Sequence, residues 1–207
     1  MDGTILNTID DITDSVNVIM ERHGLPTYDV PAIKSFVGNG LRKLMEKAMP
    51  EGEAHPQFEE IYAEFLDYYN AHSKIKTAPY EGIRDVMAAL KARGVKMAIV
   101  TNKIQPAAED LMMEHFYPDV EYIVGDVPGR NKKPHPDAIN AALEILGVSP
   151  EEKDSVLYIG DSEVDAATAL NSGLDYVLCL WGFRTREELS EFKPVLFAES
   201  PAELLEI

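Results

Sequence analysis

A short apolar run that ends in acidic residues, Val156–Asp165, constrains the fold of this 207-residue chain more than any other stretch. Its first four residues are apolar and predict a strand that is buried on both faces of a sheet. A glycine then turns the chain, and Asp161 and Asp165 follow four residues apart. If a helix begins directly after this turn, both carboxylates lie at the carboxyl end of the strand. Open α/β sheets bind their ligands at that place.

The acidic pair Asp161 and Asp165 has two interpretations. Two close carboxylates repel, and each raises the pKa of the other unless a cation lies between them. Only oxygen donors are present, with no His or Cys nearby, and such a set suits a hard ion such as Mg2+. In the alternative interpretation, both residues only cap and decorate the start of a helix. This stretch by itself leaves both interpretations open.

Composition excludes several classes of protein. The chain is 45% hydrophobic and 27% charged, an ordinary composition for a globular protein, and its 207 residues are enough for one sizeable domain or two modest ones. No apolar run is long enough to span a bilayer, we expect no signal peptide, and Cys179 is the only cysteine. These features favour a cytoplasmic protein. The net charge of −17 argues against nucleic acid or a membrane as a partner, and an anionic substrate would need local positive charge.

The first third of the chain has helical periodicity and no strand pattern. Thr8 and Asp11 predict a capping box at the start of the first helix, and a longer helix carries the aromatic residues from Phe58 to Tyr69. The pattern changes after this block. We therefore predict a helical cap at residues 9–76 and an α/β core at residues 1–8 and 77–207.

The rest of the chain alternates strand and helix patterns. Strands are predicted at residues 95–100, 122–124, 156–159, 176–180 and 195–198. Helices are predicted between them, and Glu187–Phe192 is one of these. Strands that alternate with helices imply right-handed crossovers and a parallel sheet. The predicted fold class is α/β, with a Rossmann-like parallel sheet core and an inserted helical cap subdomain.

Polar residues stand at the carboxyl ends of the predicted strands. They are Asp2 with Gly3 and Thr4, Thr101 with Asn102, Lys133, and Asp161 with Asp165. Because the carboxyl ends of parallel strands lie on one edge, we expect a hydroxyl, an amide, an ammonium and carboxylates around a metal. This set forms a phosphate site, where the metal and Lys133 neutralise the phosphoryl oxygens and Thr101 donates a hydrogen bond.

The order of four motifs resembles that of the haloacid dehalogenase superfamily. The motifs are Asp2-Gly3-Thr4, Thr101-Asn102, Lys133-Pro134-His135-Pro136 and Gly160-Asp161-Ser162-Glu163-Val164-Asp165. The resemblance covers essentially the whole chain, and the helical cap follows directly after the Asp-Gly-Thr turn, as in the family. Phe-Val-Gly-Asn-Gly at 36–40 and Trp-Gly-Phe at 181–183 further resemble the phosphoglycolate phosphatase-like branch.

The resemblance implies a Mg2+-dependent phosphatase that hydrolyses a small phosphomonoester through an aspartyl-phosphate intermediate. Asp2 would be the general acid and base, and its backbone carbonyl would ligate Mg2+. The other implied residues are Thr101 and Lys133 for catalysis, Gly3 and Asn102 for substrate binding, and Asp161 and Asp165 for the metal, with Asp165 bound directly or indirectly.

One departure from the family concerns the nucleophile. The first family motif is Asp-x-Asp-Gly-Thr at the end of a hydrophobic strand, and Met1 stands at position x. The nucleophilic aspartate would therefore precede Met1, and its strand would lie in the middle of the sheet beside the Val156 strand. We expect the natural protein to begin upstream, and almost no phosphatase activity from a chain that begins at Met1.

Three other functions remain open at this point. One is a β-phosphoglucomutase-like phosphotransferase of the same fold, and another is a catalytically dead binding protein. A dehalogenase needs no metal, and the crowding of Asp161 and Asp165 argues against it. The expected partner is a small phosphorylated metabolite, but the sequence determines neither its identity nor the oligomeric state.

Overall fold

The computed structural model describes residues 1–207, and the chain divides into two compact units. The α/β unit contains Met1, Gly3–Ile5 and Pro79–Ile207, and the helical unit contains Asp2 and Leu6–Ala78. Strands β1 (Leu6–Asn7) and β2 (Ala78–Pro79) form a two-stranded pair. None of the helices combines the length and the apolar content that crossing a membrane requires.

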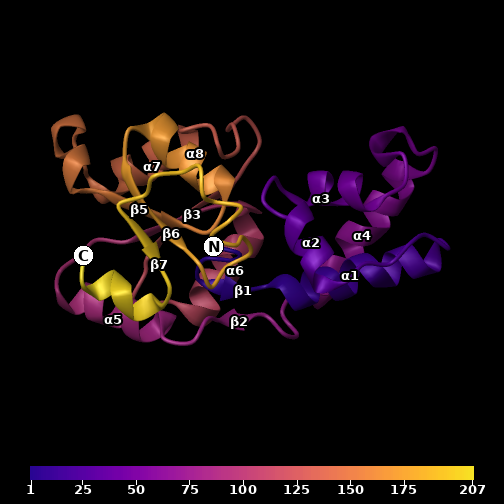
Figure 1. The fold of residues 1–207 in the computed structure, drawn as a ribbon, viewed down its shortest axis with the longest axis horizontal. Coiled ribbons are helices and arrows are strands. Elements are labelled where there is room, and N and C mark those ends of the chain that lie inside the picture. Colours follow the sequence, from indigo (N-terminus) through magenta and orange to yellow (C-terminus); the bar gives the residue numbers. More distant parts are fainter. The chain divides into compact units, whose positions relative to one another are not determined.

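Four α-helices and one 3-10 turn form the helical unit (Figure 1). They are α1 (Ile9–Arg22), α2 (Val30–Phe36), α3 (Leu41–Ala48), η1 (Gly52–Ala54) and α4 (Phe58–His72). Helix α1 contacts α2 and α4, and α3 contacts the same two helices. Apolar residues at helical spacing face one another here, and the most completely buried include Val16, Ile19, Ile33, Ile61 and Phe65.

The predicted capping box of α1 is wrong. Thr8 does occupy the N-cap position, but its side chain makes no capping hydrogen bond. The Asp11 carboxylate instead accepts the backbone N–H groups of Lys76 and Thr77 at 2.8–3.0 Å. The Asp11 carboxylate therefore binds a backbone N–H 65 residues away in the sequence and not the local capping partner Thr8. This contact connects the segment after α4 to the first turn of α1.

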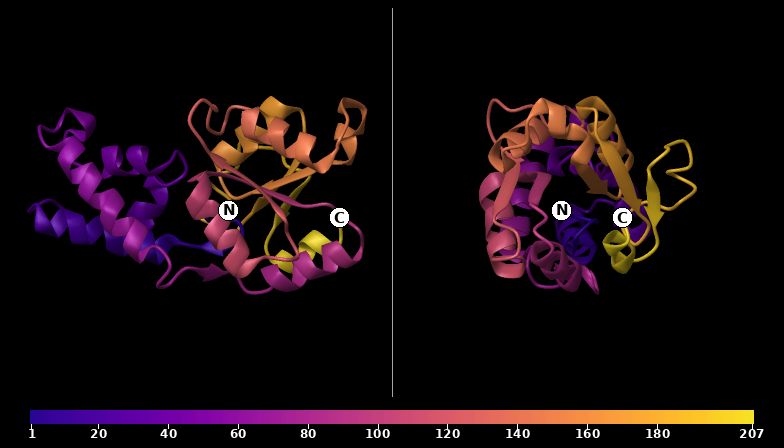
Figure 2. Two further views of the ribbon diagram at one scale, coloured as in Figure 1. Left: turned by 180° about the vertical axis from the view of Figure 1, so that it is seen from behind. Right: turned by 90° about the vertical axis from the view of Figure 1, so that its left-hand side faces the viewer.

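The α/β unit follows the predicted alternation of strands and helices. Its strands are β3 (Ala98–Ile104), β4 (Tyr122–Asp126), β5 (Leu157–Gly160), β6 (Asp175–Cys179) and β7 (Leu196–Ala198). Its helices are α5 (Ile83–Ala92), α6 (Gln105–His115), α7 (Asp137–Leu146) and α8 (Glu163–Ser172), with 3-10 turns η2 (Pro150–Ser155) and η3 (Pro201–Leu205). Figures 1 and 2 show α7 and α8 on one face of the strands and α5 with η3 on the other.

All strand pairs of this unit are parallel, which confirms the predicted Rossmann-like core, but they form two ladders. Strand β3 pairs only with β4, and β5 pairs with β6, which pairs with β7. A cavity of about 760 Å³ lies between β3 and β5. Mostly apolar residues from these strands, α5 and α7 line it, together with Met1 and Ile5.

Two local predictions in this unit need correction. Strand β3 begins at Ala98 and continues to Ile104, so Thr101 lies inside the strand and not at its end. Its pairing with β4 shifts register between Val100 and Ile104, which interrupts the ladder around the polar residues. Residues 187–192 form successive turns and not a helix, and these turns bury Leu189 completely in the core.

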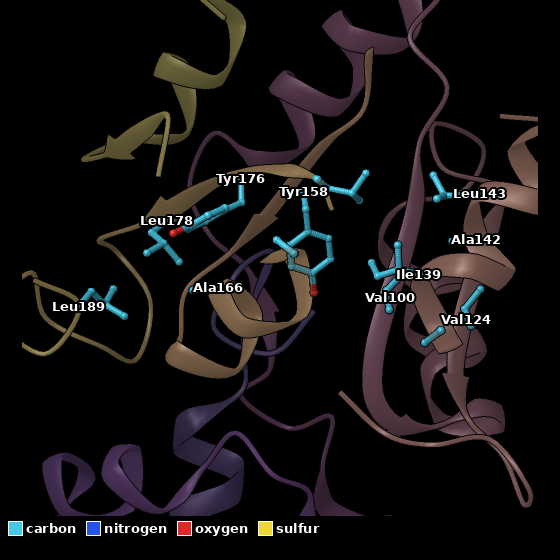
Figure 3. Packing of buried hydrophobic residues seen from close by; sticks show 13 residues of the cluster. Val100, Val124, Ile139, Ala142, Leu143, Tyr158, Ala166, Tyr176, Leu178 and Leu189 are labelled. Atoms are coloured by element: carbon cyan, nitrogen blue, oxygen red, sulfur yellow. The ribbon is translucent and has the colours of Figure 1, made fainter. Parts of the chain in front are cut away.

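One apolar cluster joins the two ladders (Figure 3). Its members on one side come from β3, β4 and α7, and those on the other side come from β6, α8 and the turns after β6. Tyr158 of β5 lies between the two groups. The labelled residues on the two sides are Val100, Val124, Ile139, Ala142 and Leu143, and Ala166, Tyr176, Leu178 and Leu189.

Replacing Leu178 with Ala should destabilise the α/β unit strongly. Leu178 is 0% exposed, so the truncation leaves a cavity, and we expect a loss of about 2–5 kcal/mol in the free energy of unfolding, measured with urea. Leu170 on α8 is 59% exposed and serves as the control, for which Leu170→Ala should change stability by less than about 0.5 kcal/mol. Equal effects of both substitutions would contradict this description of the core.

Candidate active site

The start of helix α8 brings Asp161 and Asp165 together. Ser162 is the N-cap residue, and its hydroxyl accepts the N–H of Asp165 at 3.3 Å and donates to Asp165 Oδ2 at 2.6 Å. The N–H of Asp161 donates to the same oxygen at 3.2 Å. The helix-capping interpretation therefore holds for Asp165, whose carboxylate folds back onto the first turn.

Asp165 also forms a buried ion pair with Lys133. Lys133 Nζ lies 2.8 Å from Asp165 Oδ1, and the two side chains are 8% and 6% exposed. The Tyr158 hydroxyl lies 2.9 Å from the same oxygen and 3.2 Å from Lys133 Nζ. Burial alone would lower the pKa of Lys133 and raise that of Asp165, but their attraction outweighs it and shifts both pKa values in the opposite direction.

Asp161 has fewer donors around it. Its Oδ1 accepts the Thr4 hydroxyl at 2.8 Å, and its Oδ2 accepts the N–H of Phe183 at 3.0 Å. Burial and the negative charge of Asp165 raise the pKa of Asp161 to about 6, although these two donors act in the opposite direction. A carboxylate has about four acceptor positions. Four donors therefore saturate Asp165, whereas Asp161 keeps two positions for a further ligand.

Two glycines allow the backbone to approach Asp161 closely. Gly3 has a φ of +79°, and an added Cβ would lie 2.2 Å from Asp161 Oδ2. At Gly182 an added Cβ would lie 2.4 Å from Asp161 Cβ and 2.6 Å from the carbonyl oxygen of Gly3. The Asp161 carboxylate is thus enclosed by the backbone of two loops, and any side chain at either glycine would displace it.

Asn102 connects strand β3 to the lysine loop. Its Oδ1 accepts the N–H of Lys133 at 2.8 Å, and its Nδ2 donates to the carbonyl oxygen of Lys133 at 3.2 Å. Thr101 precedes it, is 4% exposed, and accepts the N–H of Lys103 at 3.1 Å through its hydroxyl. The amide of Asn102 therefore holds the backbone of Lys133. The substrate contacts proposed for Asn102 and Gly3, and the catalytic role of Thr101, stay predictions.

The first two residues belong to different units. Asp2 is grouped with the helical unit, where its backbone forms a parallel bridge with Leu6, and its roles as general acid, general base and metal ligand stay predictions. Met1 is part of the α/β unit and is 6% exposed. The positive charge of its amino terminus lowers the pKa values of Asp161 and Asp165.

The donor set fits Mg2+ through Asp161. No three His, Cys, Asp or Glu side chains converge in an arrangement that could hold a metal ion. Mg2+ nevertheless binds commonly through one or two carboxylates, with waters and substrate phosphate oxygens completing its octahedron. The two open acceptor positions of Asp161 suit this mode, whereas the saturated carboxylate of Asp165 suits a supporting position.

Several contacts in this site were not predicted from the sequence. They are the Thr4 and Tyr158 hydroxyls, the Phe183 N–H, and a two-point ion pair of Arg184 with Glu163 at 2.8 and 3.1 Å. Tyr158 was detectable in principle, because it is the one polar-tipped residue in an otherwise apolar strand. A backbone donor such as the Phe183 N–H leaves no signature in the residue type.

Comparisons with known proteins show the family to which the chain belongs. Residues 1–179 match the haloacid dehalogenase-like hydrolases, and the chain therefore belongs to that family, as predicted. A phosphoglycolate phosphatase of Aquifex aeolicus is 32% identical over 187 residues, which cover 88% of this chain and 83% of the relative. An N-acetylmuramic acid 6-phosphate phosphatase of Pseudomonas aeruginosa is 28% identical over 209 residues, which cover 100% of this chain and 91% of the relative.

A solved structure supports the same relationship. It comes from Lactobacillus delbrueckii subsp. bulgaricus, and its name suggests a phosphoglycolate phosphatase. It is 32% identical to this chain, superposes with a TM-score of 0.93, and is matched over 100% of this chain and 94% of its own. The fold of the chain, including its helical unit, is therefore that of the family.

Replacing Asp161 with Asn should change how stability depends on pH in the metal-free protein. The pKa of Asp161 is about 6 in the folded state against an ordinary value of 3.8. Its ionisation therefore opposes folding, with no effect below the ordinary value and the full effect above about pH 6. Asn does not ionise. Between pH 4 and 7 the free energy of unfolding of Asp161→Asn should therefore rise relative to that of wild type, by on the order of 3 kcal/mol in total.

Urea unfolding in EDTA at several pH values measures this difference. Asp165→Asn is the matched control, because the pKa of Asp165 is lowered and its ionised form favours folding. Its stability relative to wild type should therefore fall as the pH rises through the unfolded pKa of about 3.9. A difference between Asp161→Asn and wild type that is independent of pH would contradict the described electrostatics.

Proposed function

We propose that the chain is a Mg2+-dependent phosphatase that hydrolyses a small phosphomonoester such as phosphoglycolate. The observation that carries the proposal is the Lys133–Asp165–Asp161 cluster, in which the loop after β4 places Lys133 against the two carboxylates that follow the carboxyl end of β5. It combines a buried cation for phosphoryl oxygens with a carboxylate that has open acceptor positions. The family membership and the phosphatase names of two curated relatives support the same reaction class.

Lys133 supplies positive charge where the phosphoryl group is transferred. Its ammonium has three N–H donors, of which one reaches Asp165 and one reaches Tyr158, and the third serves a phosphoryl oxygen. The raised pKa keeps the ammonium charged across the physiological range. The Thr101 hydroxyl donates a further hydrogen bond to the same group in this proposal.

Asp161 and Asp165 have different roles in the proposed site. Asp161 holds Mg2+ directly. Asp165 does not contact the metal but supports the site by binding the Lys133 ammonium and the first turn of α8. When bound, Mg2+ polarises the phosphoryl oxygens and offsets their negative charge. In the same proposal Asp2 transfers protons to the leaving alcohol and from the attacking water.

The nucleophile in this proposal is an aspartate that precedes Met1 in the natural protein. Met1 is buried, and its amino terminus acts electrostatically on Asp161 and Asp165, so a preceding residue would adjoin the acidic pair. The apolar cavity between β3 and β5 supports a preceding strand, because each of these strands pairs on one side only. Unpaired buried backbone groups cost about 1–3 kcal/mol each, and such a strand would pair them.

The substrate and the cellular location belong to the proposal as well. The name of the Aquifex relative favours phosphoglycolate, and that of the Pseudomonas relative adds a sugar acid phosphate to the candidates. We propose a cytoplasmic enzyme, because Cys179 is a free, buried thiol and a reducing compartment suits it.

The proposal predicts a specific pattern of phosphatase activity. A chain extended upstream in its natural reading frame should release phosphate from phosphoglycolate or a related phosphomonoester with Mg2+ and not with EDTA. The 207-residue chain should be weaker by several orders of magnitude, because removing a covalent nucleophile cost about 10⁶ in a studied hydrolase. Turnover is measured as phosphate release over a panel of metabolites that includes sugar phosphates.

Asp161→Ala in the extended chain tests the metal assignment. This substitution should abolish Mg2+-dependent turnover, whereas Asp154→Ala, at an exposed position on η2, should not change it. Survival of Mg2+-dependent turnover in Asp161→Ala would show that the metal site is assigned wrongly. A stop codon directly upstream of Met1 would exclude the preceding nucleophile and favour a catalytically dead binding protein.

A further inference from the structure

The Tyr158 hydroxyl contacts both members of the buried ion pair. It lies 2.9 Å from Asp165 Oδ1 and 3.2 Å from Lys133 Nζ, which closes a triangle with the 2.8 Å ion pair. In the apolar cluster the ring lies between the residues of β3 and α7 and those of β6 (Figure 3), and it also lines the cavity between β3 and β5. The hydroxyl is therefore carried by a residue of the paired strand β5 and not by a residue of a loop.

The chemistry of the three groups determines the direction of their hydrogen bonds. A carboxylate such as Asp165 only accepts, and an ammonium such as Lys133 only donates. The single hydroxyl proton of Tyr158 goes to Asp165, so the phenol oxygen accepts from Lys133. Two of the three ammonium donors are thereby committed in defined directions, and the direction of the third follows from tetrahedral geometry.

Lys133 needs such a second contact to keep its ammonium in one place. The residue lies in the irregular segment between β4 and α7, and a lysine stem has four flexible carbons. Asn102 holds only the backbone of Lys133, at the far end of that stem. One ion pair would let the ammonium move around Asp165, whereas two acceptors on separate elements restrict it. The Tyr158 ring centroid also lies 5.9 Å from Nζ.

We propose that Tyr158 is a positioning residue for Lys133: its hydroxyl holds the ammonium group where a phosphoryl group binds. The proposal rests on the proposed function, in which the third donor of Lys133 contacts the phosphoryl group. It assigns to Tyr158 an effect on anion binding that is transmitted entirely through Lys133.

Tyr158→Phe tests the proposal, because it removes the hydroxyl and keeps the ring. The probe is inorganic phosphate in the presence of Mg2+, titrated into the 207-residue chain by calorimetry, so that no turnover is needed. We expect affinity to fall about three- to tenfold, as for the loss of one positioning hydrogen bond. Tyr176→Phe is the matched control, because Tyr176 is the β6 partner of Tyr158 and its hydroxyl accepts the N–H of Lys193. Its phosphate affinity should stay unchanged.

A double variant separates positioning from a general structural effect. In a Lys133→Met background, Tyr158→Phe should change phosphate affinity by less than about twofold, because its effect passes through Lys133. Lys133→Met leaves the Asp165 charge buried and unpaired, so Lys133→Met is combined with Asp165→Asn in both members of the comparison if the Met variant alone does not fold. Equal losses in both backgrounds would mean that Tyr158 acts on the fold and would overturn the proposal.

A second measurement needs no anion. The Lys133 ammonium should give a slowly exchanging ¹⁵N resonance in wild type and a broadened or absent one in Tyr158→Phe, with Tyr176→Phe like wild type. An unchanged resonance together with unchanged phosphate affinity in Tyr158→Phe would refute the positioning role. Failure of the proposed function has a different signature, in which Lys133→Met binds phosphate as tightly as wild type, or wild type does not bind it.

Discussion

The buried ion pair between Lys133 and Asp165 is the interaction on which the rest of the site depends. Removing two charges from water is costly, and such a pair persists only where further hydrogen bonds satisfy both partners. Asp165 receives donors from the start of α8 and from Tyr158 on β5, and Asn102 on β3 holds the backbone of Lys133. The pair therefore joins β3, β5, α8 and the loop before α7. Its value lies less in stability than in placing one cation at a defined point.

Two aspartates four residues apart have acquired opposite properties. Asp165 is surrounded by four donors including an ammonium, and its pKa is lowered, whereas Asp161 has two neutral donors and a raised pKa. The repulsion that makes the pair unfavourable without a cation is thus concentrated on Asp161. A site in which one carboxylate is satisfied by the protein and the other is not is suited to an external cation. The helix-cap interpretation of the motif holds for Asp165, and the metal-site interpretation of Asp161 stays a prediction.

Local pattern predicted the elements better than their ends and contacts. The apolar runs of β5 and β6 predicted both strands, but only β6 is buried on both faces, since Leu157 and Ile159 of β5 are half-buried. The alternation with helices predicted the parallel pairing. The extension of β3 through Thr101, the turns at 187–192 and the failed capping box of Thr8 were not predictable in this way. In each case a tertiary contact decided the outcome, such as the burial of Leu189 or the bonds from Asp11 to the segment after α4.

The sequence by itself determined the class of fold, the order of the motifs and the presence of carboxylates after the strand that became β5. These follow from periodicity and from the residue types, which a chain carries before it folds. The prediction of Lys133 at a strand end was wrong, because β4 ends at Asp126 and Lys133 lies in the loop that follows. Only the tertiary structure decided which carboxylate is saturated, because Asp161 takes a donor from Thr4, 157 residues away, and Asp165 takes Lys133 and Tyr158 from other elements. The strength and number of such donors depend on distances between elements, and no local pattern encodes those distances.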